Sequence, residues 1–234
     1  MSPTPDARVD ALLRDLGSRL RRGSHEAARQ TSGGRRHPTG LTDVDALLGG
    51  GFPAGRLCEI AGSLSSGRTS LALALLSQAT RAGEWTAFVD AADAFDPSSA
   101  HAAGITLPRV LWVRPQDSGQ AARACARLLE LRGFALIALD LPPASRERAL
   151  PPAAWQRLAR AAAASGTSLV VLSEQRLTGT SSSLVLETRC ARARWSGMPA
   201  LLEGLEIEAQ VARAREGLAR RIAAVRLCAA SRAA

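Results

Sequence analysis

Apolar and polar positions alternate in blocks along the chain, and each block has the period of a strand or of a helix. Short apolar runs of strand length are bounded by glycine, proline and polar residues, and they cover 56–62, 85–91, 110–114, 134–141 and 167–175. Between them, three segments show the helical period and end at a glycine, namely 68–83, 118–133 and 152–166. Apolar strands that alternate with helices predict an α/β fold with a mostly parallel sheet covered on both faces.

The first 38 residues have a different pattern. An apolar stripe with arginines opposite it predicts a helix, and it consists of Val9, Leu12, Leu13, Leu16 and Leu20. A Gly/Ser/Arg stretch without apolar period follows, which is typical of a linker. We therefore expect 1–38 to be an N-terminal helical arm and basic linker, and 39–234 to be the core domain with a basic C-terminal segment.

Residues 205–228 fit two patterns. One amphipathic helix would carry Ile207, Val211, Leu218, Ile222 and Val225 on a stripe. Two strands turning near Gly217 would instead use the alternation of apolar and polar positions that runs from 205 to 211. Periodicity alone leaves both possibilities open.

Composition restricts the function classes. The 234 residues carry a formal net charge of +9, and all 30 basic residues are arginine. Segments 1–40 and 187–234 are basic, whereas 41–186 is nearly neutral, so the ends suit nucleic acid or acidic protein surfaces, or serve only solubility. The four cysteines and three histidines lack ligand spacing, so we expect no metal site. No apolar run reaches the roughly 20 residues of a membrane span, and no secretory signal opens the chain, so we expect a cytoplasmic protein without membrane contact.

The stretch "GSLSSGRTS" at 62–70 has the spacing of a phosphate-binding loop, and it stands between a predicted strand and a predicted helix. Arg68 replaces the lysine of that motif, and its planar guanidinium can block the phosphate site or fill it from inside. Asp140 ends a strand where a magnesium-binding carboxylate is expected, or simply caps a loop. The candidate nucleotide-binding residues are Gly62, Ser65, Ser66, Gly67, Arg68, Thr69, Ser70, Asp140 and Gln175.

Residues 39–175, from "TGLTDVDALLGGGFPAGRLCEIAG" through "VDAADAFDP", resemble the RecA recombinase core, and a weaker similarity extends to about residue 228. The resemblance implies a RecA-like P-loop NTPase core, which binds ATP and Mg²⁺. It also implies a C-terminal antiparallel hairpin, and thus favours strands over a helix for 205–228.

The sequence departs from RecA at the residues and loops that serve catalysis, nucleotide sensing, DNA binding and filament assembly in RecA. Ala92 stands where RecA has its water-activating glutamate, and a methyl group cannot orient water. Glu174 replaces the asparagine beside the sensor Gln175, the two DNA-binding loops are short, and the linker lacks an aromatic residue for filament assembly. We therefore expect a vestigial nucleotide site with no catalytic residue and no cofactor. The alternative is ATP with Mg²⁺, or a phosphate or sulfate ion, at the degenerate loop.

A RecA-like chain of this size with these departures resembles the ImuA family of accessory proteins. That resemblance implies a non-catalytic role in SOS mutagenesis and translesion DNA synthesis in the bacterial cytoplasm, associated with the nucleoid when engaged. It implies RecA and the ImuB pseudo-polymerase as partners, and an error-prone replicative-type polymerase indirectly. The arginines of the two basic ends, together with the shortened loops, predict at most weak, non-specific DNA binding. The alternatives are an active DNA-dependent RecA-like ATPase and a SulA-like cell-division inhibitor.

Overall fold

The structure is a computed structural model, and it describes residues 34–143, 150–198, 201–215 and 222–228. The helix predicted from the apolar stripe between Val9 and Leu20 and the turn predicted at Gly217 lie outside the described residues. The first described element is β1 (Arg36–His37), which pairs with β2 (Phe52–Pro53) in a two-stranded sheet. Strand β1 falls in the last residues of the expected linker and pairs with β2 of the core. The boundary expected between 38 and 39 therefore stays a prediction.

The main sheet has eight strands in the order β10-β9-β8-β3-β7-β6-β4-β5. Strands β3 to β8 run parallel to one another, whereas β9 pairs antiparallel with β8 and β10 pairs antiparallel with β9. The strands are β3 (Leu57–Ala61), β4 (Trp85–Asp90), β5 (Val110–Val113), β6 (Phe134–Asp140), β7 (Ser168–Ser173), β8 (Leu184–Ser196), β9 (Leu201–Ala214) and β10 (Ile222–Cys228).

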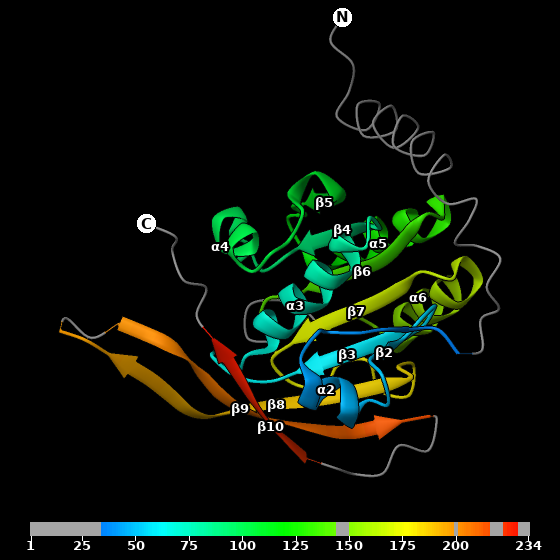
Figure 1. Ribbon diagram of the computed structural model, residues 1–234. Helices are drawn as coiled ribbons and strands as arrows, with labels where there is room; N and C mark the ends of the chain where they lie inside the picture. The colour runs from blue at the N-terminus through cyan, green and yellow to red at the C-terminus, as the bar shows by residue number, and fades with distance from the viewer. Residues whose placement is uncertain (1–33, 144–149, 199–200, 216–221, 229–234) are drawn as a thin grey trace, which may run out of the picture.

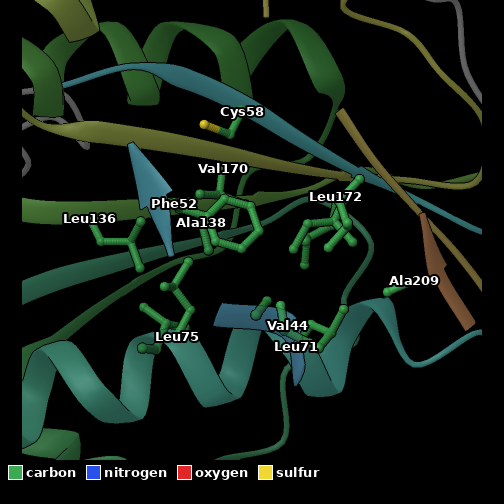
Figure 2. Packing of buried hydrophobic residues seen from close by; sticks show 14 of the residues in the cluster. Val44, Phe52, Cys58, Leu71, Leu75, Leu136, Ala138, Val170, Leu172 and Ala209 are labelled. Carbon is green, nitrogen blue, oxygen red and sulfur yellow. The ribbon is translucent and has the colours of Figure 1, made fainter. Parts of the chain in front are cut away.

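Helices cover both faces of the parallel part of this sheet (Figure 1). Helices α2 and α3 pack on one face of the sheet, against residues that include those of β8, β9 and β10, and Figure 2 shows Leu71 and Leu75 of α3 against the strands. Helices α5 and α6 pack on the other face. The helices are α2 (Thr42–Leu47), α3 (Arg68–Arg81), α4 (Pro97–Ala102), α5 (Ser118–Leu131) and α6 (Pro152–Ser165), with a 3-10 turn at Leu107–Arg109. The predicted α/β fold with a covered parallel sheet is confirmed.

Local chemistry explains where these helices begin and end. Asp117 caps α5, because its carboxylate accepts a hydrogen bond from the backbone N–H of Gln120 at 2.6 Å. Pro152 opens α6, since a proline at the first helical position loses no intrahelical bond. Gly166 ends α6 with a φ of 77°, a conformation that favours glycine.

The C-terminal segment is a strand hairpin, as the resemblance implied. Strand β10 pairs antiparallel with β9, from Ile222 opposite Gln210 to Cys228 opposite Gly204. The preceding strand β8 was not predicted from the sequence. Its pairing with β9 shifts register at three places, and such bulges break the alternation by which a strand is recognised.

A buried carboxylate ties the loop after β7 to the centre of the sheet. Glu59 in β3 is fully buried, and it accepts hydrogen bonds from Ser173 Oγ at 3.0 Å and from the Leu177 backbone N–H at 2.6 Å. The backbone N–H and hydroxyl of Thr178 donate to its other oxygen at 3.3 and 2.5 Å. Four donors to one carboxylate fix the start of this loop.

We expect Glu59→Ala to lower the free energy of unfolding by about 3 kcal/mol, because buried donors lose a charged acceptor. Chemical denaturation of the full chain measures the change. Glu187→Ala is the matched control: its exposed ion pair with Arg176 is worth less than about 1 kcal/mol. Equal losses in the two variants would contradict the anchoring role of Glu59.

Candidate nucleotide site

The phosphate-binding loop joins β3 to α3 and packs against the C-terminal strands. Gly67 has a φ of 85° and caps α3, and a Cβ added there would lie 2.7 Å from Cδ1 of Leu227. A Cβ at Gly62 would lie 2.3 Å from the hydroxyl oxygens of Ser66 and Thr188. The two glycines of the motif are therefore required by strands β8 and β10 as well as by the turn itself.

Two backbone amides of the loop already donate to carbonyls of the protein. The Gly62 N–H donates to the Ser173 carbonyl at 3.0 Å, and the Ser66 N–H donates to the Ser63 carbonyl at 3.2 Å. The Ser66 hydroxyl is buried and accepts a hydrogen bond from the Thr188 hydroxyl at 2.9 Å. Phosphate loops bind anions through free backbone N–H groups, so these contacts reduce what the loop offers a phosphate.

Arg68 points into the loop. Its side chain is buried, with 8% of the residue exposed, and Nη1 donates to the Gly62 carbonyl at 2.5 Å. The lysine of a working loop instead directs its charge at the outer phosphates. Of the two possibilities raised by the sequence, the structure shows the second: the guanidinium fills the loop from inside.

Asp140 lies at the end of β6 beside the charge of Arg68. The residue is 2% exposed, and its Oδ1 has no hydrogen-bond partner. Burial raises the pKa of Asp140 to about 7, the nearby Arg68 opposes that rise, and Asp90 adds to it. A buried carboxylate with a free oxygen is suited to a cation or a proton, and the cation that acts on the pKa of Asp140 is the guanidinium of the loop itself.

The neighbouring carboxylate, Asp90, has a structural role that the sequence did not suggest. It ends β4 opposite Asp140 and is buried. Its oxygens accept hydrogen bonds from the backbone N–H groups of Ala94 and Phe95 at 2.9 and 3.1 Å, and from Trp112 Nε1 at 3.2 Å. These bonds shape the loop that carries position 92.

That loop presents no carboxylate to the site. Ala92 is half-buried, and the next residue, Asp93, has a φ of 52° and an exposed side chain. Asp93 pairs with Arg114, with 2.5 Å between Oδ1 and Nη2. The carboxylate of the adjacent Asp93 is thus directed to Arg114.

Gln175 lines a cavity beside the phosphate-binding loop. A cavity of about 400 Å³ opens where β3 and β7 end and where β8, β9 and β10 pass. Ala61 and Gly62 line it, and so does Gln175 with Glu174 and Arg176. The remaining lining residues come from the C-terminal strands, namely Glu187, Thr188, Arg189, Glu208, Gln210 and Ile222. These cavity residues of β8, β9 and β10 were not predicted from the sequence, because their meeting depends on the register of strands that only the fold brings together.

The predicted residues thus separate into groups. Gly62, Ser66, Gly67 and Arg68 form a packed loop core close to Asp140, whereas Ser65 is exposed at the loop tip with a φ of 60°. Thr69 and Ser70 stand half-buried in the first turn of α3, and Gln175 faces the cavity. Within the ranges described, no three His, Cys, Asp or Glu side chains gather as metal ligands, and no helix is long and apolar enough to cross a membrane.

Comparisons with known proteins agree with this architecture. Residues 17–149 match the RecA N-terminal domain family, and the chain belongs to that family. It is 39% identical over 103 residues to Protein RecA of Leptospira biflexa, and 43% identical over 117 residues to Protein RecA of Rubrobacter xylanophilus. Those matches cover 44% and 50% of this chain but only 27% and 33% of the relatives, so the chain spans about a third of their length or less.

A solved structure extends the likeness of fold to the C-terminal strands. The crystal structure of the RadB recombinase superposes with a TM-score of 0.64 at 21% identity, and it covers 81% of this chain and 95% of that one. The RecA-like fold inferred from the sequence is therefore confirmed.

The buried carboxylate gives a test of the site through pH. The folded-state pKa of Asp140 is raised from 3.8 to about 7, so between those values the folded chain holds a proton that the unfolded chain releases. Asp140 therefore costs stability increasingly as the pH rises through this window. We expect the free energy of unfolding of Asp140→Asn, relative to that of the unaltered chain, to rise by about 2–4 kcal/mol between pH 4 and pH 8.

Denaturation of both proteins at a series of pH values measures this gain. A difference in unfolding free energy that is constant from pH 4 to pH 8 would show that Asp140 is not a buried, uncompensated acid.

Proposed function

We propose that this chain is a non-catalytic, RecA-like accessory protein of damage-induced translesion DNA synthesis, similar to ImuA, which binds RecA and the ImuB pseudo-polymerase. An error-prone replicative-type polymerase is engaged indirectly, and DNA is bound weakly and without sequence preference. Family membership supports a relationship to recombination and DNA repair proteins. The non-catalytic character is argued from the site.

The inward position of Arg68 carries the proposal. A nucleotide needs a positive charge at its outer phosphates. The guanidinium of Arg68 instead donates to the Gly62 carbonyl, and its charge acts on Asp140. Phosphoryl transfer depends on positioned charge and on an oriented water. Position 92 has only a methyl group for the second task, so the loop supports neither requirement.

The loop after β7 supports a protein-binding role over a DNA-binding one. This loop is anchored by Glu59 at its start. The side chains of Arg213 and Arg215 donate to the carbonyls of the next two residues, Gly179 and Thr180, at 3.2 and 2.7 Å. A loop held along its middle in this way has little freedom to follow a DNA strand. The two arginines are also less available for an acidic partner than their place in the sequence suggests.

We expect the unaltered chain to show no ATP hydrolysis above background, with or without single-stranded DNA. A missing base alone typically lowers the rate by ~10²–10⁴, and the inward arginine lowers it further. A phosphate-release assay compares the chain with Arg68→Lys, Ala92→Glu and the double variant. DNA-stimulated hydrolysis by the unaltered chain that is lost in Asp140→Asn would instead establish an active RecA-like ATPase.

The partners have their own test. Purified, immobilised chain should retain RecA and ImuB, and it should not retain a bacterial division GTPase. Retention of the division protein alone would favour the SulA-like alternative. Retention of none of the three would contradict the accessory role, whatever the ATPase result.

A further inference from the structure

The segments that lead into the parallel strands lie at one edge of the sheet, which we call the amino edge. Strands β3 to β8 run in the same direction (Figure 1), so they all begin at this edge. Hydrogen bonds join neighbouring segments. The Gly55 N–H donates to Ser168 Oγ at 3.1 Å, and Thr167 Oγ1 donates to the Phe134 carbonyl at 2.7 Å. The segments of the amino edge are 54–56, 81–84, 107–109, 132–133, 166–167 and 181–183.

Four of these six segments carry one arginine each, just ahead of β3, β5 and β6 and at the end of α3. They are Arg56, Arg109, Arg132 and Arg81. The six segments hold one acid, Glu84, and its carboxylate pairs with Arg35. Within the described residues, none of the four arginines forms an ion pair. The amino edge is therefore positively charged.

Exposed acids of the parallel sheet lie at the opposite edge, where the strands end. They follow β4, β5 and β7, and they are Asp93, Asp96, Asp117 and Glu174. Arg114 and Arg176 stand at that edge as well, but each is paired with a carboxylate. The nearly neutral body of the chain, 41–186, thus has its unpaired arginines gathered on one side.

Helix dipoles explain only part of this arrangement. Cations are favoured at helix C-termini, which accounts for Arg81 and Arg132 at the ends of α3 and α5. Arg56 follows the turn after β2, and Arg109 ends a 3-10 turn, so neither stands at the end of an α-helix. Arg132 has a φ of 51°, a strained conformation for an arginine, and such strain is kept where a position is used.

We propose that the amino edge binds the phosphodiester backbone of nucleic acid. Neighbouring strands lie about 4.8 Å apart, so the arginines ahead of β3, β6, β4 and β5 form a row roughly 20 Å long. A row of positive charges suits a linear polyanion, whose phosphates repeat along a line. The loop after β7, which is held in place, begins at the opposite edge. The inference deepens the weak, sequence-independent DNA binding of the proposed function and rests on it.

An acidic protein is the other polyanion to consider. Protein interfaces depend on a few buried aromatic or other large anchors. Among the described residues, no exposed large apolar side chain falls in the six segments. Their turns are instead open: a Cβ added at Gly83 or at Gly166 would meet no atom within 4 Å. Open, small turns between arginines favour close approach of a phosphate backbone over docking of a protein.

Fluorescence anisotropy of a labelled oligo(dT) strand of about 20 nucleotides, titrated with nucleic-acid-free full-length chain at about 50–300 mM salt, tests the proposal. Arg56→Gln/Arg132→Gln should weaken binding at least tenfold at about 50 mM salt. It should also reduce the slope of log K against log salt by about 1.4, since each phosphate contact to a single strand contributes about 0.7.

The matched control is Arg123→Gln/Arg157→Gln, which removes the same charge from exposed positions in α5 and α6, away from the amino edge. It should leave the slope unchanged. Circular dichroism establishes that each variant is folded. Should the edge variant fail to fold, Arg56→Gln/Arg81→Gln replaces it, with the same expected weakening.

The outcomes separate this surface from the proposed function. Equal binding by the edge variant and the unaltered chain would overturn the assignment of the surface and leave weak DNA binding intact. An equal loss in the control variant would overturn it too, because binding would then follow net charge alone. An edge variant that loses polyglutamate but keeps oligo(dT) would assign the edge to an acidic protein. No binding by the unaltered chain at about 50 mM salt would contradict the DNA binding itself.

Discussion

The burial of one guanidinium inside the phosphate loop determines the character of this site. The buried guanidinium of Arg68 donates to the Gly62 carbonyl. Its charge also acts on Asp140, but burial prevails there and raises the pKa of that carboxyl to about 7. The loop thus keeps its backbone path while its charged side chain is directed into the protein.

The C-terminal strands pack against the phosphate-binding loop. Thr188 of β8 bonds to Ser66, and Ile207 and Leu227 pack on Gly67. The antiparallel strands are therefore structural support for the loop. Glu59, one strand away, fixes the segment that follows β7. Together these contacts explain how the fold of a nucleotide-binding protein persists in a site whose working residues have changed.

Much of the fold could be predicted from local sequence, because buried parallel strands such as 134–141 and capped helices such as 118–133 carry strong periodic signals. The phosphate loop was recognisable for the same reason. Strand β8 was missed, since its bulges disturb the alternation. The direction of Arg68, the hydrogen bonds of Asp90 and the cavity wall from β8 to β10 could not be predicted. They depend on contacts between residues far apart in sequence.

Nucleotide binding tests most directly the central claim, that Arg68 is directed into the loop and away from a bound phosphate. Isothermal titration of Mg·ATP into the full-length chain should give no saturable heat up to about 1 mM, which means a binding free energy weaker than about −4 kcal/mol. Arg68→Lys, titrated in parallel, shows what the loop binds once the guanidinium is removed. Saturable binding of the unaltered chain at tens of micromolar or tighter would contradict the account.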